Sequence, residues 1–356
     1  MEEYLLEMKN IHKRFPGVYA LKGVDLTLKA GEVMALVGEN GAGKSTIINI
    51  LGGIYTRDEG EILIDGKDAG IHGIQDAKAA GINIIHQELV LVPYLSVAEN
   101  IFLNREPVKG GMVDYGKMYE MAQKFIDDLG LTGIRAEDKV AELTVAQQQM
   151  VEIVKSVSFN ARIIVMDEPT SSLSDREIDA LFENIRSLKK RGIGIIYISH
   201  RLSELEQICD RVTVFRDGQS VAVANVSDVT NEEIVNLMVG REMTNYYTRT
   251  YRKPGKVVMS VKHLSSNYVK DVSFDLREGE ILGFSGLVGA GRTEVIKAIL
   301  GFDEMTAGTV ELYGNEIHIK NPSQAYAQKI GFIPESRREE SLFAFQSNRF
   351  NMTIRI

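Results

Sequence analysis

The sequence has one cysteine, no long apolar run and no excess of positive charge. Cys209 cannot form a disulfide within the chain, which suits a reducing cytoplasm, and in "LEQICDRV" we expect it to be a small buried side chain. No apolar stretch reaches the ~20 residues that a membrane-spanning helix needs. The acidic start "MEEYLLEMKN" lacks the features of a secretory signal. A net charge of −8 disfavours nucleic-acid binding. Any role at a membrane is therefore expected to be peripheral, through a partner that spans it.

What the chain does have is an internal repeat. The segment from Leu21, "LKGVDLTLKAGEVMALVGENGAGKSTIINILGG", aligns with "VKDVSFDLREGEILGFSGLVGAGRTEVIKAILG" from Val269, an offset of 248 residues. The same offset places Gln87 on Glu335 without a gap. With 356 residues, 44% of them apolar, the chain can bury more than one core. We interpret it as two domains of one fold in tandem, the second of them incomplete.

The predicted domain boundaries follow from this repeat. Residues 1–240 form the first domain, with a helical lobe at about 88–145 inserted between core strands. Residues 241–256 are polar and aperiodic and are predicted to be a linker, and residues 257–356 form the incomplete second domain.

Buried parallel strands are predicted from continuous apolar runs at 33–37, 82–85, 162–166 and 193–199. Capping-box patterns predict one helix after Ser174, running to about Lys189, and another after Thr230. The pattern is typical of an α/β nucleotide-binding architecture.

The stretch "GENGAGKS" satisfies the phosphate-loop pattern G-x-x-x-x-G-K-[ST] in full. Its glycines let backbone N–H groups wrap an oxyanion, and the helix that follows points its positive end at the phosphates. Lys44 is predicted to reach the β and γ oxygens, and Ser45 to bind Mg²⁺. The residues predicted to bind nucleotide here are Gly38, Glu39, Asn40, Gly41, Ala42, Gly43, Lys44, Ser45 and Thr46.

Two adjacent carboxylates end the predicted strand "RIIVMDE", at the edge where open α/β sheets bind ligands. Asp167 is predicted to hold Mg²⁺, directly or through water, and Glu168 to polarise the attacking water. Together with the phosphate loop, this pair identifies a P-loop NTPase.

The motifs around these residues resemble the ATP-binding cassette family, in order along nearly the whole chain. Phe15 resembles the aromatic residue that stacks on adenine, and Gln87 the Q-loop residue that ligates Mg²⁺ and senses the membrane partner. His200 in "YISHR" resembles the switch histidine that contacts the γ-phosphate. "DEPTSSLS" resembles the acidic pair with its D-loop, except that Ser174 stands where an aspartate is common. The signature motif corresponds to Leu143, Thr144, Val145, Ala146 and Gln147 in "LTVAQQQ".

More narrowly, the chain resembles the tandem ATPase subunits of bacterial ribose, galactose and xylose importers. The resemblance implies a RecA-like core, an antiparallel β subdomain and an inserted helical subdomain, followed by a partial second copy. It implies ATP and Mg²⁺ as cofactors, and ATP hydrolysis that drives monosaccharide import through a separate integral-membrane permease at the cytoplasmic face. A sugar-binding protein would take part indirectly, and no nucleic acid is expected.

The second copy carries an altered loop, "GLVGAGRT", with arginine in place of lysine. Its candidate nucleotide-binding residues are Gly286, Gly289, Gly291, Arg292 and Thr293. In the family, two domains close head to tail, so that one domain's loop faces the other's signature. The altered loop would then face "LTVAQ", in which Val145 and Ala146 replace the usual glycines. We expect this site to bind nucleotide and to hydrolyse it poorly, because a planar guanidinium differs in geometry from an ammonium group.

The intact first loop would need the signature of a second copy, which these 356 residues do not contain. We therefore expect a C-terminally truncated chain that needs a second nucleotide-binding half, in cis or in trans. Two alternatives remain open: a tandem ATP-binding cassette protein of translation or DNA repair, and a non-catalytic remnant. The short linker and altered second loop disfavour a translation factor, and the single cysteine excludes the cysteine-based zinc modules of the repair ATPases.

Overall fold

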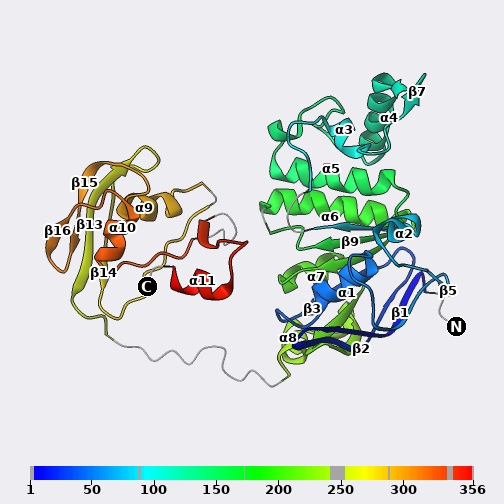
Figure 1. Ribbon diagram of the computed structural model, residues 1–356, viewed down its shortest axis with the longest axis horizontal. Helices are drawn as coiled ribbons and strands as arrows, with labels where there is room; N and C mark the ends of the chain where they lie inside the picture. Colours follow the sequence, from blue (N-terminus) through cyan, green and yellow to red (C-terminus); the bar gives the residue numbers. More distant parts are fainter. Residues whose placement is uncertain are drawn as a thin grey trace. The chain divides into compact units, whose positions relative to one another are not determined.

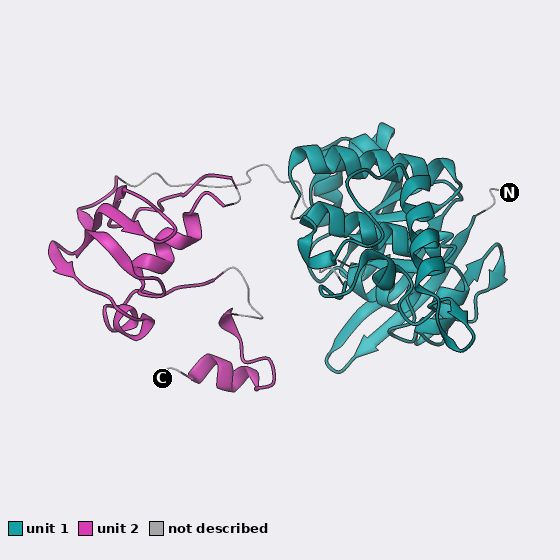
Figure 2. Cartoon of the chain, turned by 90° about the horizontal axis from the view of Figure 1, so that it is seen from above, with its two compact units in different colours: residues 1–246 teal, residues 247–356 magenta. Residues whose placement is uncertain are grey.

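The computed structural model describes residues 4–86, 90–171, 173–240, 253–287, 289–334 and 340–354. The chain forms two compact units, residues 1–246 and 247–356 (Figure 2). The first unit contains two sheets and a helical lobe, and the second contains one sheet with short helices (Figure 1). Among the described residues, no helix has both the length and the apolar character that crossing a bilayer requires.

The centre of the first unit is a six-stranded sheet in the order β12-β11-β3-β10-β9-β6, parallel except for β12. Its strands are β3 (Val33–Gly38), β6 (Ile82–Ile85), β9 (Ile163–Asp167), β10 (Gly194–Ile198), β11 (Arg211–Arg216) and β12 (Gln219–Asn225). Apolar side chains on both faces of β3, β9 and β10 are buried, which explains their continuous apolar runs. All four strands predicted from the sequence are confirmed to within one residue at each end. Because β10 lies between β3 and β9, the carboxyl ends of these three strands meet at one edge.

A second, antiparallel sheet has the order β2-β1-β4-β5. Its strands are β1 (Leu6–Phe15), β2 (Val18–Leu28), β4 (Glu59–Ile64) and β5 (Lys67–Asp68). Leu6, Met8 and Leu26 from this sheet and Ile47 from α1 (Lys44–Leu51) belong to one buried cluster. The antiparallel sheet is thereby packed against the helix that follows the phosphate loop.

Helices complete the first unit. They are α2 (Ile74–Ala79), α3 (Val97–Ile101), α4 (Tyr115–Asp128), α5 (Val145–Ser158), α6 (Asp175–Lys190), α7 (Leu202–Ile208) and α8 (Asn231–Val239). The capping boxes predicted at Ser174 and Thr230 are both confirmed, and α6 ends one residue beyond the predicted Lys189.

The segment predicted to be a helical lobe contains α3, α4 and a small hairpin of β7 (Val108–Lys109) with β8 (Met112–Val113). Helix α4 buries Met118, Ala122 and Ile126, spaced four residues apart, in the same apolar cluster as residues of α3 and α5. The lobe is therefore held on the first unit through α5, the helix that begins in the signature-like motif.

Cys209 follows α7 and is partly buried against the main apolar cluster. Burial raises the pKa of its thiol, with a smaller effect from the nearby carboxylate of Asp210. A thiol that resists ionisation is a poor nucleophile. Cys209 was predicted to be buried, and the structure shows it partly buried.

The second unit repeats part of the first at the predicted offset. Its antiparallel sheet, in the order β14-β13-β15-β16, contains β13 (Val257–Ser266), β14 (Val272–Arg277), β15 (Met305–Leu312) and β16 (Asn315–Ile317). Helices α9 (Arg292–Ile299) and α10 (Pro322–Ala327) lie 248 residues after α1 and α2, residue for residue, and a further helix, α11 (Asn348–Thr353), follows.

The central strands are not repeated. Segments 281–286 and 330–333, the counterparts of β3 and β6, are not in strands. Ile281 is 93% exposed and Ile333 94%, whereas their counterparts Val33 and Ile85 are 0% and 1% exposed. In the first unit β3 pairs with β10 and β11, and β6 with β9. The described residues of the second unit include no counterparts of these partner strands, so its two apolar segments have no sheet to join.

Candidate nucleotide-binding site

The first phosphate loop joins the end of β3 to the start of α1. Gly41 and Gly43 have φ values of 86° and 105°, in the left-handed region that favours glycine. A Cβ at Gly43 would lie 2.7 Å from Leu21 Cδ2, and one at Gly38 would lie 2.3 Å from the carbonyl oxygen of Phe215. The loop is thus pressed against β2 and β11, and only glycine fits at these positions.

Lys44 is the first residue of α1, and its side chain folds back over the loop. Its Nζ donates to the carbonyl oxygens of Gly38, at 2.6 Å, and of Glu39, at 3.0 Å. Burial lowers the pKa of Lys44, although the charges of Asp167 and Glu168 act in the opposite direction. The ammonium group is therefore held above the loop by weak acceptors, which an incoming phosphate oxygen can replace.

The predicted acidic pair lies at the carboxyl end of β9, which is separated from β3 by β10. Glu168 has a φ of 48°, uncommon for a residue other than glycine, and its N–H donates to the carbonyl oxygen of Ile198 at 2.9 Å. His200 Nδ1 lies 3.2 Å from Glu168 Oε1. The structure therefore brings together Glu168 and His200, two residues predicted from motifs 32 positions apart in the sequence.

Asp167 is partly buried beneath this pair. Burial raises the pKa of Asp167, and the charge of Glu168 raises it further, against smaller opposing effects of His86 and Lys44. A nearby cation stabilises the ionised form of a partly buried carboxyl group. Asp167 is therefore suited to hold a metal ion or a cationic partner.

Asp167→Asn is expected to stabilise the chain without nucleotide. Because the pKa of Asp167 is raised on folding, its contribution to stability is greatest below the unfolded value of 3.8 and is lost as pH rises through the folded pKa. The asparagine variant has no charge to bury and should melt roughly 1–3 °C higher at pH 7, with the difference shrinking as pH falls toward 3.8. Thermal melts at several pH values would test this, with Asp179→Asn on the exposed face of α6 as control. A melting temperature of Asp167→Asn below that of the wild type at pH 7 would contradict the raised pKa of Asp167.

A cavity of about 610 Å³ joins these groups. Its lining includes Phe15, Asn40, Gly41, Gly43, Lys44, Ser45, Thr46, Asp167 and Glu168, all predicted from the sequence. It also includes Val18, Tyr19, Lys22, Asp217 and Gly218, which sequence reasoning missed. Phe15 makes an edge contact with Tyr55, with ring centroids 5.3 Å apart, and lies at the end of β1. The cavity is of ordinary size for a small-molecule site, with its aromatic and phosphate-binding residues in one space.

The signature-like motif forms the start of α5. Thr144 caps the helix: its hydroxyl accepts from Gln147 N, and Gln147 Oε1 accepts from Thr144 N. Val145 is 46% exposed at the first helical position. The positive end of the α5 dipole is thus presented beside an exposed side chain. Gln87, predicted to ligate Mg²⁺, lies outside the described residues.

The described residues at the end of the second loop, from Gly289 to Arg292, resemble their counterparts in the first loop. Gly289 and Gly291 have φ values of 80° and 87°, close to those of Gly41 and Gly43, and Arg292 begins α9 as Lys44 begins α1. Arg292 is exposed, whereas Lys44 is partly buried. The end of the second loop therefore matches the first at its two glycines and differs at the cationic side chain.

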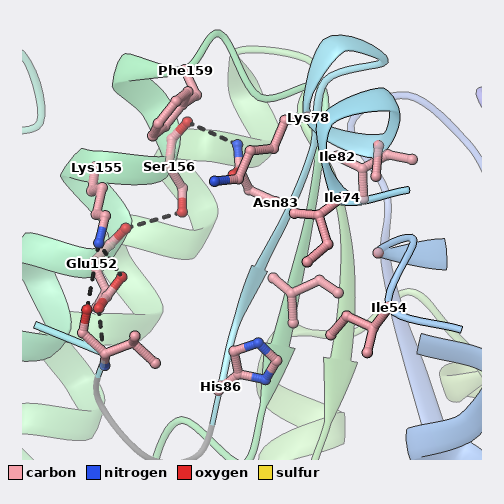
Figure 3. A pocket seen from close by; sticks show the side chains of 14 residues that line it. Ile54, Ile74, Lys78, Ile82, Asn83, His86, Glu152, Lys155, Ser156 and Phe159 are labelled. Carbon is pink, nitrogen blue, oxygen red and sulfur yellow. Dashed lines mark hydrogen bonds and ion pairs between the residues drawn. The ribbon is translucent and has the colours of Figure 1, made fainter. Parts of the chain in front are cut away.

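A further pocket of about 350 Å³, the β6–α5 pocket, lies beside the Gln87 segment (Figure 3). Its lining residues are Gly52, Ile54, Ile74, Ala77, Lys78, Ile82, Asn83, Ile84, His86, Val90, Glu152, Lys155, Ser156 and Phe159. Two side chains of α5 hold the backbone of Val90, since Glu152 Oε1 accepts from its N–H at 3.2 Å and Lys155 Nζ donates to its carbonyl at 3.5 Å. Figure 3 shows Ile54 and Ile74 on the opposite side from Glu152 and Lys155. The chain that follows Gln87–Leu89 is thereby tied to the helix of the signature-like motif.

Comparisons with known proteins identify the family and the fold of the chain. A family model described as "ABC transporter" matches residues 21–171 and 269–354. The chain is 45% identical over 354 residues to a putative ribose/galactose/methyl galactoside import ATP-binding protein of Halalkalibacterium halodurans, covering 99% of this chain and 68% of the relative. It is also 45% identical over 355 residues to the galactose/methyl galactoside import ATP-binding protein MglA of Escherichia coli K12, covering 99% and 70%.

A solved structure of the ADP conformation of MJ1267, an ATP-binding cassette of an ABC transporter, superposes with a TM-score of 0.56 at 28% identity, covering 67% of this chain and 96% of that one. The predicted α/β P-loop fold with a partial second copy is confirmed. An ATP-binding cassette domain implies nucleotide binding, as predicted. The chain belongs to the ATP-binding cassette family of ABC transporter ATPases.

Proposed function

We propose that this chain is the ATP-binding and ATP-hydrolysing subunit of a monosaccharide importer and acts on a separate membrane permease. The observation that carries the proposal is the single cavity in which Lys44, Asp167 and Glu168 meet, with His200 beside Glu168. The relatives named for ribose and galactose import add the substrate class, at 45% identity over almost the whole chain. The alternatives of a translation or repair ATPase and of a non-catalytic remnant receive no support from these relatives.

The residues of the first loop can each be given a role. Backbone N–H groups from Gly41 to Ser45 and the start of α1 would hold the phosphates, and Lys44 would neutralise the β and γ oxygens. Ser45 and Asp167 line the same cavity and offer the oxygen donors that Mg²⁺ prefers. Bound Mg²⁺ would neutralise charge on the β- and γ-phosphates. Phe15 would stack on adenine at the other end of the cavity.

Hydrolysis needs a group that orients and deprotonates water. The N–H of Glu168 bonds to the carbonyl oxygen of Ile198, which anchors the backbone from which its carboxylate extends. His200 lies close enough to Glu168 to orient that carboxylate and, being exposed, can reach a γ-phosphate. The Arg292 loop would bind a second nucleotide and hydrolyse it poorly, because the changed cation alters phosphate geometry.

The β6–α5 pocket is proposed as the permease contact. It combines exposed isoleucines, Ile54 at 46% and Ile74 at 50%, with charged groups on α5 (Figure 3). It adjoins both flanks of the Gln87 segment, His86 and Val90, and Val90 is bonded to Glu152 and Lys155 of α5. Movement of a bound permease segment would therefore reach the Gln87 segment and α5. The chain would act at the cytoplasmic face of the membrane as a peripheral subunit.

Sugar uptake in the host tests the function. Deleting the coding sequence is expected to reduce uptake of radiolabelled ribose, galactose or xylose at least about tenfold for the transported sugar, and the unmodified coding sequence should restore it. A Glu168→Gln version should not, because binding without hydrolysis cannot drive repeated cycles. Unchanged uptake of all three sugars in the deletion strain would contradict the proposal of monosaccharide import.

A further inference from the structure

A buried carboxylate with no role in the scheme above lies just behind His200. Glu204 is in the first turn of α7 and is 3% exposed. Three hydroxyl groups donate to it: Thr170 Oγ1 at 2.7 Å, Tyr197 at 2.9 Å and Ser199 Oγ at 2.7 Å. Arg201 Nη1 lies 3.7 Å from Glu204 Oε1. Carboxylates are seldom buried this deeply unless they are fully partnered, and Glu204 is.

These partners come from the ends of two neighbouring strands. Thr170 follows the acidic pair at the end of β9, two residues after Glu168. Tyr197 lies in β10, and Ser199 immediately precedes His200. Ser199 Oγ also accepts from the N–H of Arg201 at 3.0 Å, so the residues on both sides of His200 belong to the network. One carboxylate thus ties together the segment that carries Glu168 and the segment that carries His200.

We infer that Glu204 is a positioning residue for ATP hydrolysis, which fixes His200 against Glu168 by bonding the chain on either side of His200 and the chain that follows Glu168. The inference rests on the proposed role of these two residues in hydrolysis. The distance that matters is 3.2 Å, between His200 Nδ1 and Glu168 Oε1. The two strand ends are also joined by a backbone hydrogen bond, in which the N–H of Glu168 donates to the carbonyl oxygen of Ile198. This bond restrains only the backbone.

Loss of the carboxylate would leave the two segments free to shift. Thr170 and Tyr197 are 2% and 0% exposed, so their hydroxyl groups would be buried without their acceptor. The pKa of Tyr197 is raised by burial and then by the charge of Glu204, which keeps its hydroxyl protonated and able to donate. A small displacement suffices, because a catalytic group moved by about 1 Å can lose a large part of its effect.

The test compares Glu204→Ala and Glu204→Gln with a matched control, Glu206→Gln. Glu206 is on the same helix, is exposed, and accepts from Asn231 Nδ2 at 2.6 Å outside the network. Glutamine at 204 keeps the side-chain shape and one acceptor oxygen. Ser199→Ala removes a single donor and serves if Glu204→Ala does not fold, as judged by circular dichroism and melting temperature.

The first readout does not depend on activity. The ring resonance of His200, identified by its absence in His200→Asn, is followed in ¹H–¹³C spectra of the purified chain. We expect it to move in Glu204→Ala and in Ser199→Ala, to move less in Glu204→Gln, and to stay unchanged in Glu206→Gln. If a folded Glu204→Ala or Ser199→Ala variant leaves the resonance at the wild-type position, the inference is wrong.

The second readout is single-turnover ATP hydrolysis. Glu204→Ala is expected to lower the rate at least about tenfold while ATP affinity stays within about twofold, since the phosphate loop is untouched. The rate of Glu204→Gln should fall between those of Glu204→Ala and the wild type. The rate of Glu206→Gln should match the wild type. Equal loss of affinity and rate would indicate general structural damage and count against a positioning role. If the wild-type chain hydrolyses no ATP, the proposed hydrolysis by this chain fails, while the His200 resonance still decides the positioning role.

Discussion

Lys44→Ala is expected to weaken ATP binding to the first loop at least about 100-fold. A hydrogen bond to a charged group contributes about 1.5–3 kcal/mol, and Lys44 is predicted to make such bonds to the β- and γ-phosphates, so a loss of about 3 kcal/mol corresponds to this factor. The variant should remain folded, because Lys44 Nζ bonds only to two carbonyl oxygens of the loop itself among the bonds described. Titration with a fluorescent ATP analogue, with displacement by ATP, measures the affinity.

The second loop supplies the matched control for this experiment. Arg292→Ala changes the equivalent position 248 residues later and should leave the affinity of the first loop unchanged. Lys44→Arg places the cationic residue of the second loop in the first loop. It should retain more affinity for ATP than Lys44→Ala because the positive charge is kept. Tight binding that survives Lys44→Ala but not Arg292→Ala would contradict the assignment of the first loop as the main nucleotide site.

The pH dependence of ATP affinity provides an independent check of Lys44. Because burial lowers the pKa of Lys44 without nucleotide, the side chain begins to lose its proton at a lower pH than a lysine in water. A bound phosphate favours the charged form, so binding above this pKa must be coupled to proton uptake. Affinity is therefore expected to fall as pH rises toward 10.5 in the wild type, and to fall less steeply in Lys44→Arg. Titrations between pH 7 and pH 10 would show the difference.

Local motifs predicted which residues of the first site lie together, because each motif has its own backbone requirement. The loop from Gly38 to Ser45, the strand before it and the helix after it are contiguous, so their geometry follows from neighbouring residues. Glu168 and His200 are distant in sequence, but both follow apolar runs that form adjacent parallel strands. The edge of the sheet then brings them together without any further information.

What the sequence did not predict depends on packing between elements. Asp217 and Gly218 reach the nucleotide cavity because the turn after β11 folds against β2, which no local pattern indicates. Glu204 looks like an ordinary residue in the first turn of a helix until its three hydroxyl partners are seen together. In the second unit the repeat predicts the same fold, yet Ile281 is exposed because a parallel strand is stable only between neighbours. Sequence similarity therefore predicts the local geometry of loops and helices. A parallel sheet forms only where the neighbouring strands are also present.

Glu168→Gln is expected to lower the rate of ATP hydrolysis at least about 100-fold and to leave ATP affinity within about threefold. General base catalysis contributes about 10²–10⁴-fold, and glutamine keeps the shape of the side chain without accepting a proton. The N–H of Glu168 that bonds to Ile198 belongs to the backbone and is retained, so the loop and strand should be undisturbed.

Single-turnover hydrolysis with the chain in excess over labelled ATP is the suitable measurement, because it resolves slow rates. High chain concentration also allows two copies to provide each other with the "LTVAQ" motif at the start of α5. Hydrolysis that is lost in both Glu168→Gln and Lys44→Ala would place the reaction at the first loop with Glu168 as base. Hydrolysis that survives Glu168→Gln but not Lys44→Ala would keep the site and remove Glu168 from its role, leaving His200 or another group of the cavity to activate water. Turnover equal to the Lys44→Ala background in the unmodified chain would contradict hydrolysis by this chain alone. It would mean that "LTVAQ", with Val145 and Ala146 in place of glycines, does not serve as a working signature, and that a second nucleotide-binding half must supply one.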